Sequence, residues 1–407
     1  MAVVGIIAEY HPFHRGHAWQ ISKVRECLGE DTAVVAVMSG NFVQRGDFAV
    51  FSKHARAEMA LMGGADLVLE LPTPWASATA ERFAQGAVAI MKATGIVSHL
   101  AFGCESGDVL PLQKAAGALS REEYPELLRR FLAEGMSFAA ARQEAVDKLI
   151  GEDATVLSRP NNALAVEYLC ALSAQGTGIE PLALPRIGAD HDSAELGRYP
   201  SASAIRGVLT SGGDWEALVS EETAAIMRRE IDGGRAPVTM RTAERAILAK
   251  LRSMREEEFE RFDGGGEGLY HRFYHAVHAG WDIESILENA KTKRYPLARL
   301  RRMLLHSYLG VSQAAQGEKP PYIRVLGANG RGRDLLRGMR ESALLPIITK
   351  PADARDLDET ACALFECESA STDLYTLAMP DLSNSVPDVE FKRPAVMVGT
   401  KNERRTK

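Results

Sequence analysis

Residues 7–17 of this 407-residue chain read Ile7-Ala8-Glu9-Tyr10-His11-Pro12-Phe13-His14-Arg15-Gly16-His17, and this stretch decides the fold. It follows an apolar run at residues 3–7 and precedes a helical pattern that starts near residue 18. A strand, a tight loop and a helix form a phosphate-binding corner, because a helix start offers backbone N–H groups and a positive dipole end to an anion. Gly16 lets the backbone come close, and His14 and His17 can donate ring N–H bonds to phosphate oxygens. The pattern predicts a site that stabilises a phosphoryl transition state.

A His-x-x-His pair has other interpretations, since it also occurs as a surface pair or as half of a metal site. No third metal ligand stands at helical spacing near His14 and His17, so zinc is the less favoured interpretation. The pair lies in the first strand–loop–helix unit of a predicted α/β sheet, where such folds bind nucleotides. We therefore expect phosphate binding here and no protein-bound metal ion.

A second candidate anion site follows Pro200. Ser201 and Ser203 stand at the start of a predicted helix, and Arg206 lies in its first turn. Serine caps helix starts, and the adjacent N–H groups and guanidinium suit a phosphate. Taken alone, a simple capped helix explains this segment equally well. Its occurrence together with the histidine pair favours the phosphate interpretation.

The two segments resemble the signatures of the His-x-Gly-His nucleotidylyltransferase superfamily, in which the second segment clamps a triphosphate opposite the histidines. The wider stretch around Glu9 and Tyr10 is similar to one family within it, the bacterial tRNA(Met) cytidine acetate ligases. That family usually has asparagine at the positions of His11 and Arg15. The resemblance implies an α/β fold: a Rossmann-like nucleotidylyltransferase domain on a parallel sheet, followed by a mainly α-helical domain.

The resemblance also implies residue roles. It assigns catalysis at the phosphates to His14, His17 and Arg206. Arg186 is chemically suited to phosphate binding or adenine stacking. The residues that the resemblance implies for ATP binding are Ile7, Ala8, Glu9, Tyr10, His11, Pro12, Phe13, His14, Arg15, Gly16, His17, Ala18, Trp19, Gln20, Gly103, Asn162, Arg186, Ile187, Ser201 and Ser203.

A polar loop after the second predicted strand is the candidate substrate pocket. Substrates of α/β proteins bind at the carboxyl ends of the strands, and the family resemblance implies that this loop faces the reaction centre. Ordinary loop composition is the alternative interpretation. Lys53 and Arg56 on the following helix are expected to be solvated. The pocket residues predicted from this loop are Ser39, Gly40, Asn41, Gln44 and Asp47.

The first two hundred residues alternate short apolar runs with helical patterns, which is typical of a parallel sheet covered by helices. Strands are predicted at 3–8, 33–38, 67–71, 100–103 and 182–187, with a helical insertion at about 107–157. Beyond about residue 214 charged helices dominate, although 322–326 could be a short strand or an extended connection. We therefore predict a nucleotide domain at 1–214, a mainly helical domain at 215–399 and a disordered tail at 400–407.

Composition limits the class of protein. The chain is 46% hydrophobic and 25% charged, which is typical of a globular protein. Its net charge of −6 argues against a surface that is basic throughout and binds nucleic acid generally. No apolar run reaches the roughly 18 residues of a membrane span. Five scattered cysteines and the lack of a secretory pattern favour the cytoplasm. No protein partner is inferred.

One local basic cluster stands out in the second half of this acidic chain. Leucines at 297, 300 and 304 predict one apolar helix face, with Arg299 and Arg302 pointing away from it. The alternative interpretation is a solvated helix face without a ligand. A dense basic cluster also suits binding of a polyanion, and the family resemblance implies that this polyanion is tRNA. The candidate tRNA-binding residues are Lys291, Lys293, Arg294, Arg299, Arg301 and Arg302. Arg324, Arg331, Arg333 and Arg337 are expected to extend this surface.

The resemblance implies a two-step reaction on ATP, acetate and elongator tRNA(Met). Acetate would attack the α-phosphorus of ATP, and N4 of the wobble cytidine would then take the acetyl group from acetyl-adenylate. Magnesium is expected to accompany ATP, although no paired-carboxylate site for it can be recognised. Two alternatives remain open: a small-molecule adenylyltransferase of cofactor biosynthesis, and a non-catalytic nucleotide- or RNA-binding protein.

Overall fold

The computed structural model describes residues 1–105, 107–186, 199–262, 266 and 268–399. Its centre is an eight-stranded sheet in the order β10-β8-β5-β2-β1-β6-β7, with β9 paired to β8. The strands are β1 (Val3–Ala8), β2 (Ala33–Ser39), β5 (Leu67–Leu71), β6 (His99–Cys104), β7 (Glu180–Pro185), β8 (Ile323–Ala328), β9 (Ile347–Ile348) and β10 (Val396–Met397). The five strands predicted from the first part of the sequence are all present. The expected α/β class is confirmed.

The five strands from β5 to β7 run parallel, and their order reverses at β1, which pairs with β2 on one side and β6 on the other. β2 is buried along its whole length, as expected for an apolar strand covered on both faces. In such sheets the ligand crevice lies at the carboxyl ends of the strands where the order reverses. The loop that follows β1 is therefore placed at the crevice.

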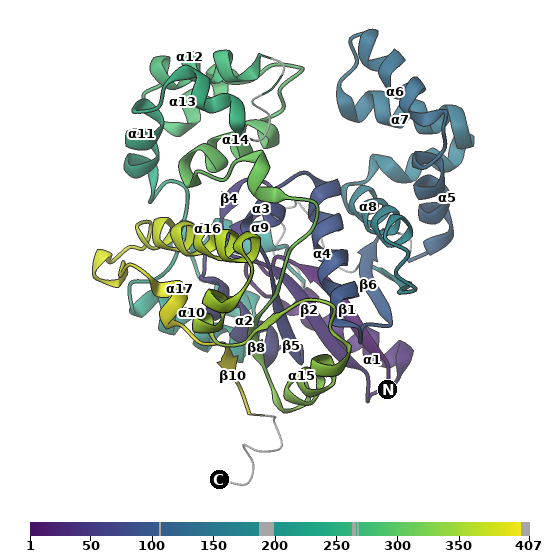
Figure 1. The fold of residues 1–407 in the computed structure, drawn as a ribbon, viewed down its shortest axis with the longest axis vertical. Helices are drawn as coiled ribbons and strands as arrows, with labels where there is room; N and C mark the ends of the chain where they lie inside the picture. The colour runs from purple at the N-terminus through teal and green to yellow at the C-terminus, as the bar shows by residue number, and fades with distance from the viewer. Residues whose placement is uncertain (106, 187–198, 263–265, 267, 400–407) are drawn as a thin grey trace.

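Helices cover the sheet and form two apolar cores against it. The helices that surround the crevice or pack on the sheet are α1 (Arg15–Leu28), α2 (Lys53–Met62), α3 (Thr73–Ala76), α4 (Ala80–Thr94), α8 (Pro160–Ala174), α9 (Ala202–Thr210) and α10 (Glu221–Asp232). The predicted insertion is helical as expected, and it consists of α5 (Val109–Leu119), α6 (Tyr124–Ala133), α7 (Phe138–Ile150) and a 3-10 segment (Gly151–Ser158). Figure 1 shows α5–α7 at the right, away from the other helical group.

That other group contains α11 (Glu244–Arg252), α12 (Leu269–Ala279), α13 (Ile283–Ala290) and α14 (Leu297–Leu309), at the upper left of Figure 1. These helices share a core of their own. Phe42 and Phe48 also belong to that core, and they come from a hairpin in the first part of the chain, β3 (Phe42–Val43) and β4 (Asp47–Phe48). The hairpin therefore joins the sheet region to the helical group.

The chain then returns to the sheet, which the sequence did not predict. β8 pairs antiparallel with β5, and β10 pairs with β8. The remaining helices are α15 (Gly330–Ser342), α16 (Glu359–Thr376) and α17 (Val389–Lys392). The boundary expected near residue 215 consequently does not separate the sheet from the rest of the chain. The short strand considered at 322–326 is real, and it is a member of the central sheet.

Within the described part of the chain, no helix has both the length and the apolar character needed to cross a membrane.

Candidate active site

The two histidines cap the start of α1 with their own side chains. His14 Nδ1 accepts a hydrogen bond from Gly16 N–H at 3.0 Å, and His17 Nδ1 accepts one from His14 N–H at 3.2 Å. The rings stack with centroids 3.8 Å apart and an interplanar angle of 29°. Because each Nδ1 is an acceptor, each neutral ring carries its proton on Nε2. Both Nε2–H groups are therefore donors, which is what a phosphate oxygen requires.

The backbone N–H groups at the start of α1 are less available to a phosphate than the sequence predicted. Gly16 N–H donates to the His14 ring, and the N–H groups of His17 and Ala18 donate to the His14 carbonyl at 2.9 and 3.2 Å. Gly16 is needed for this packing, because a Cβ there would lie 2.9 Å from His14 Cε1. The glycine thus makes room for a histidine ring, and the ring edges, in place of these backbone groups, are the donors of this corner.

Two buried aromatic rings fix the orientation of His17. Tyr10 and Phe13 are each 1% exposed, and their ring centroids lie 4.8 and 5.5 Å from that of His17. Tyr10 has a φ of 46°, in the left-handed region that non-glycine residues rarely adopt. Such a conformation persists only where packing enforces it, and it is common at functional sites. The His17 ring is therefore held in place by the protein itself.

Arg206 joins the second predicted signature to the first. Its Nη1 donates a hydrogen bond to the His11 carbonyl oxygen at 2.8 Å. The His11 ring is buried, and its Nδ1 accepts from Val50 N–H at 3.2 Å. Burial, and then the charges of Arg206 and Arg56, hold the pKa of His11 well below its usual range. His11 therefore stays neutral and serves the loop as a hydrogen-bond acceptor.

Ser201 is the N-cap of α9, as predicted. Its Oγ accepts a hydrogen bond from Ala204 N–H at 3.0 Å, and the residue is buried. Ser203 is half-buried in the first turn. The cap hydroxyl is thus engaged within the helix, and the guanidinium of Arg206 is the charged group that this segment brings to the loop after β1.

The carboxyl ends of β6 and β7 bring the third group of predicted residues together. Asn162 Oδ1 accepts from Glu105 N–H at 3.1 Å, and the Glu105 carboxylate accepts from Asn161 Nδ2 and Asn162 N–H at 3.0 and 3.1 Å. Arg186 Nη1 donates to Asn161 Oδ1 at 2.6 Å. Asn162 is therefore fixed in place at the start of α8, with Arg186 beside it. Ile187, which was also predicted to bind ATP, lies outside the residues that the structure describes.

The other predicted ATP-binding positions surround these contacts. Gly103 is half-buried, and a Cβ on it would lie 3.1 Å from Arg186 Cγ. Arg15 is exposed, whereas Pro12 is buried. The remaining positions are half-buried at the end of β1 or in the first turns of α1, namely Ile7, Ala8, Glu9, Ala18, Trp19 and Gln20. Their contact with a nucleotide stays a prediction.

The predicted substrate pocket divides into a buried turn and a hairpin. Ser39 and Asn41 are 0% and 3% exposed, and Gly40 between them is also buried. This turn lies beneath the surface of the region, and its contact with a substrate stays a prediction. Gln44 lies in the hairpin loop, where its N–H donates to Glu9 Oε1 at 2.7 Å and its Nε2 to the Ala78 carbonyl at 3.2 Å. Asp47, at the start of β4, is half-buried.

Arg56 is fully buried, so the expectation that it is solvated is wrong. Its guanidinium donates to four backbone carbonyls, those of Glu9, Ser39, Gly40 and Phe51. Burial lowers the pKa of Arg56 to about 10. This one side chain ties the end of β1 to the end of β2. It thereby fixes the spacing of the histidine loop and the turn after β2.

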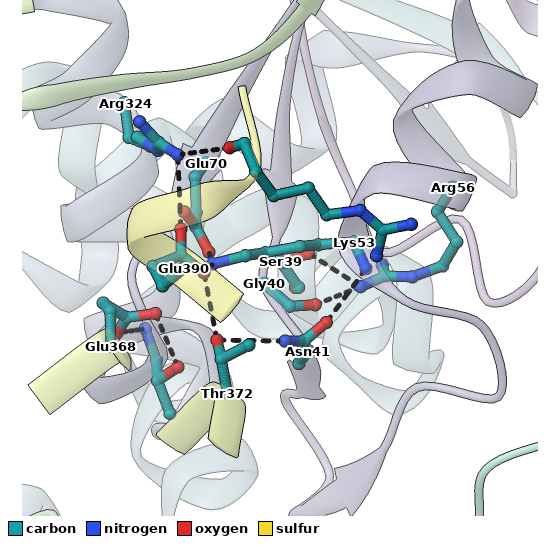
Figure 2. Close-up of polar contacts among 12 residues, drawn as sticks. Ser39, Gly40, Asn41, Lys53, Arg56, Glu70, Arg324, Glu368, Thr372 and Glu390 are labelled. Carbon is teal, nitrogen blue, oxygen red and sulfur yellow. Dashed lines mark hydrogen bonds and ion pairs between the residues drawn. The ribbon is translucent and has the colours of Figure 1, made fainter. Parts of the chain in front are cut away.

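Lys53 is also buried, at 1% exposure, which corrects the same expectation. Its Nζ lies 2.7 Å from Glu70 Oε1 and 2.7 Å from Glu390 Oε2 (Figure 2). Arg324, which was expected on a basic surface, is buried and contacts Glu390 Oε1 at 3.4 Å. Asn41 joins this network, because its Oδ1 accepts from Lys53 N–H at 2.9 Å. The turn after β2 is therefore fixed by residues from the end of the chain.

The titration behaviour of this network follows from its charges. Burial opposes ionisation of Glu390, but Lys53 and other nearby positive charges outweigh it and lower the pKa of Glu390 to about 2. For Glu368, which accepts from Thr73 N–H at 2.6 Å, burial and the charge of Glu70 raise the pKa to about 8. Glu368 is therefore largely protonated at neutral pH. Burial also raises the pKa of Glu70, although the charge of Lys53 acts in the opposite direction.

The basic cluster surrounds the start of α14. Lys291, Lys293 and Arg294 are exposed, and Arg299 and Arg301 are half-buried. The guanidinium carbons of Arg294 and Arg299 lie 5.8 and 5.3 Å from the centroid of the Tyr295 ring. Arg302 is only 8% exposed, so the prediction that it points to solvent is wrong.

The burial of Arg302 has a clear cause. The hairpin loop packs on the backbone of α14, and a Cβ on Gly46 would lie 2.5 Å from the Arg302 nitrogen. α14 is thus covered both by its own helical group and by the hairpin that carries Asp47. The predicted substrate loop and the predicted tRNA-binding helix therefore meet.

Comparison with known proteins agrees with this geometry. The chain matches the HIGH nucleotidyl transferase family over residues 1–388. A tRNA(Met) cytidine acetate ligase of Syntrophomonas wolfei is 38% identical, over 94% of this chain and 96% of the relative. One of Thermoanaerobacter sp. is 36% identical, over 97% of this chain and the whole relative. The chain belongs to the tRNA(Met) cytidine acetate ligase family.

Two solved structures of Thermotoga maritima TmcAL are similar to this member of the ligase family along its length. Each is 34% identical and aligns over 98% of this chain and 100% of the solved chain. The TM-score is 0.94 for the apo form and 0.92 for the form bound with alpha-thio ATP. The expected family, the ligase class and the fold are thus confirmed.

Sequence reasoning missed the residues that support the acetate ligase site from beneath. Arg56 and Lys53 lie in the first turn of a helix that directly follows the substrate loop, and that position was the available signal. Their burial could not be recognised locally, because Glu390, a partner of Lys53, is 337 residues away in the sequence. Within the described structure Arg56 donates to backbone carbonyls, which leave no pattern in a sequence.

Proposed function

We propose that this chain activates acetate with ATP and transfers the acetyl group to N4 of the wobble cytidine of elongator tRNA(Met). The products would be N4-acetylcytidine, AMP and pyrophosphate. The observation that supports the proposal is the contact of Arg206 with the His11 carbonyl, which joins the two segments that are predicted to bind phosphate. Relatives that match along nearly their whole length and are named tRNA(Met) cytidine acetate ligase support the acceptor.

In the first step acetate attacks the α-phosphorus and pyrophosphate leaves. The step needs alignment and stabilisation of the charge that grows on the phosphate oxygens. The Nε2–H groups of His14 and His17 are held as donors by their Nδ1 bonds, so they require no reorganisation during reaction. Arg206 supplies positive charge from the opposite side. No covalent enzyme intermediate is required.

In the second step the tRNA must reach acetyl-adenylate. The exposed residues Lys291, Lys293 and Arg294, with Arg299 and Arg301 behind them, are proposed to bind its phosphate backbone. α14 leads from this basic cluster to the hairpin beside the nucleotide loops. We propose the cytoplasm, where tRNA is modified, as the place of action.

Magnesium is proposed to arrive with ATP. Within the described residues no group of three or more His, Cys, Asp or Glu side chains could hold a metal ion. The ion would therefore be held mainly by the triphosphate and water.

The test of this function is product formation. The purified chain is incubated with ATP, labelled acetate and elongator tRNA(Met), and the nucleosides are analysed after digestion. We expect label in N4-acetylcytidine together with one AMP and one pyrophosphate for each acetyl group. Transfer of AMP to a small acceptor, without acetate, would replace this proposal by the adenylyltransferase alternative.

A further inference from the structure

Asp47 occupies the place where the two substrates would meet. It opens β4, in the hairpin that connects the nucleotide loops with α14. Its neighbour Gly46 packs on the α14 backbone at Arg301 and Arg302. The positive charges of Arg301 and of Arg206 in α9 act on the Asp47 carboxylate. Arg206 belongs to the proposed triphosphate clamp, and Arg301 belongs to the proposed tRNA surface. In Figure 1 β4 lies below α14, between that helix and the sheet, and β4 and α14 are in contact.

The hairpin holds this carboxylate in a defined position. Val43 pairs with Asp47 in the β3–β4 ladder, and Gly46 has a φ of 75°, which suits glycine. Gly46 packs on the backbone of α14, and Gln44 is bound to Glu9 of the histidine loop. Phe48 N–H donates to Asp47 Oδ1 at 2.8 Å. The second oxygen, Oδ2, can take up a proton without breaking this bond.

The other acid–base groups of the site make contacts of their own. His14 and His17 accept backbone N–H groups at Nδ1 and so carry a proton on Nε2, which makes them donors. Glu9 Oε1 accepts from Gln44 N–H. Glu70 is buried against Lys53. Asp47 differs from them in its place on a hairpin that contacts both the histidine loop, through Gln44, and α14, through Gly46.

We propose that Asp47 is a catalytic residue of the second step, in which it accepts the proton lost by the cytidine amine. This proposal rests on the proposed ligase function. The N4 nitrogen forms a bond to the carbonyl carbon of acetyl-adenylate, and the bond from that carbon to the AMP phosphate oxygen breaks. AMP leaves with the electron pair, and one N4 proton passes to Asp47 Oδ2 and then to water.

The environment of Asp47 suits this task. Burial raises the pKa of its carboxyl group above the ordinary value, although the Phe48 N–H bond, Arg301 and Arg206 act in the opposite direction. A higher pKa makes the carboxylate a better proton acceptor. The N4 lone pair of cytidine is delocalised into the ring, so the amine is a weak nucleophile that gains from removal of its proton.

The test separates the two half-reactions in Asp47→Asn. Asparagine keeps an Oδ1 acceptor for Phe48 N–H but cannot take up the proton, so the fold of the hairpin is preserved. We expect transfer from preformed acetyl-adenylate to tRNA to fall by about 10²–10⁴-fold, the usual contribution of general base catalysis. Acetate-dependent exchange of pyrophosphate into ATP should fall far less.

The pH profile distinguishes catalysis from a structural role. In the wild type the single-turnover transfer rate should rise with pH as Asp47 ionises and then level off. Asp47→Asn should lack this rise, and Asp47→Glu should retain it with part of the rate. Equal loss of exchange and transfer in Asp47→Asn, or transfer with an unchanged rise, would overturn the proposal. Absence of acetate-dependent exchange in the wild type would instead overturn the proposed function.

Discussion

Arg206 Nη1 lies 2.8 Å from the carbonyl oxygen of His11. The two residues are 195 positions apart, and each belongs to a segment whose composition alone suggests only an anion-binding loop. Their contact places a guanidinium beside a loop whose histidines present ring N–H donors. Positive groups thereby converge from two elements on one region, which suits a nucleoside triphosphate better than a single phosphate.

Replacement of Arg206 by lysine tests this relationship. Lysine keeps the charge, but it lacks the planar set of donors needed to bind the His11 carbonyl and a phosphate together. We expect acetate-dependent pyrophosphate exchange to fall by roughly 10²–10³-fold, as for loss of a transition-state donor. Arg228→Lys is the matched control, because Arg228 pairs with Glu216 at the surface. Exchange by Arg206→Lys at the rate of this control would show that the contact is only structural.

The Lys53 network should govern stability. Lys53→Met leaves Glu70 and Glu390 buried without their shared cation, and loss of one partner of a buried pair costs about 3–5 kcal/mol. We expect a clearly lower urea midpoint for this variant. Lys23→Met, which breaks the exposed pair with Glu26, should leave the midpoint almost unchanged. Equal midpoints for the two variants would contradict the buried network.

Glu368 should make stability depend on pH. Its pKa in the folded protein is raised to about 8, from an ordinary value of 4.5, so the folded state binds a proton more tightly than the unfolded state. The free energy of unfolding should therefore decrease as pH rises between these two values. Glu368→Gln, which mimics the protonated form and keeps an acceptor for Thr73 N–H, should flatten this slope. A slope that is unchanged in the variant would assign the effect to another group.

The basic cluster can be tested with its exposed members. The triple variant Lys291→Glu, Lys293→Glu and Arg294→Glu should weaken tRNA binding strongly and reduce its dependence on salt, while pyrophosphate exchange continues. Arg129→Glu with Arg130→Glu changes exposed charges on α6 and is the control. Filter binding over a range of salt concentrations measures the difference. tRNA binding that is equally weakened in both variants would place the docking surface elsewhere.

The sequence was a good guide where the signal is local. The stretch 7–17 and the segment that begins at Ser201 contain their own strand, cap and charge patterns, and the structure brings them together as expected. The five parallel strands also follow from short apolar runs. Such patterns need only neighbouring residues to be recognised.

Long-range burial was not predictable in the same way. Lys53, Arg302 and Arg324 look like surface residues, because a charged side chain on a helix or strand is usually solvated. Each is buried because a distant segment covers it: α17 with Glu390 for Lys53 and Arg324, and the Gly46 loop for Arg302. β8 was missed as a sheet member for a related reason, since its partner β5 lies about 250 residues earlier.

The central claim is that the His14–His17 corner activates acetate on ATP. Acetate-dependent exchange of labelled pyrophosphate into ATP, in the absence of tRNA, measures this step directly. We expect exchange with the wild type and with His278→Ala, an exposed histidine of α12, and a loss of about 10²-fold or more in His17→Ala. Exchange that needs a phosphate-bearing acceptor in place of acetate, or that persists at the wild-type rate in His17→Ala, would contradict the account.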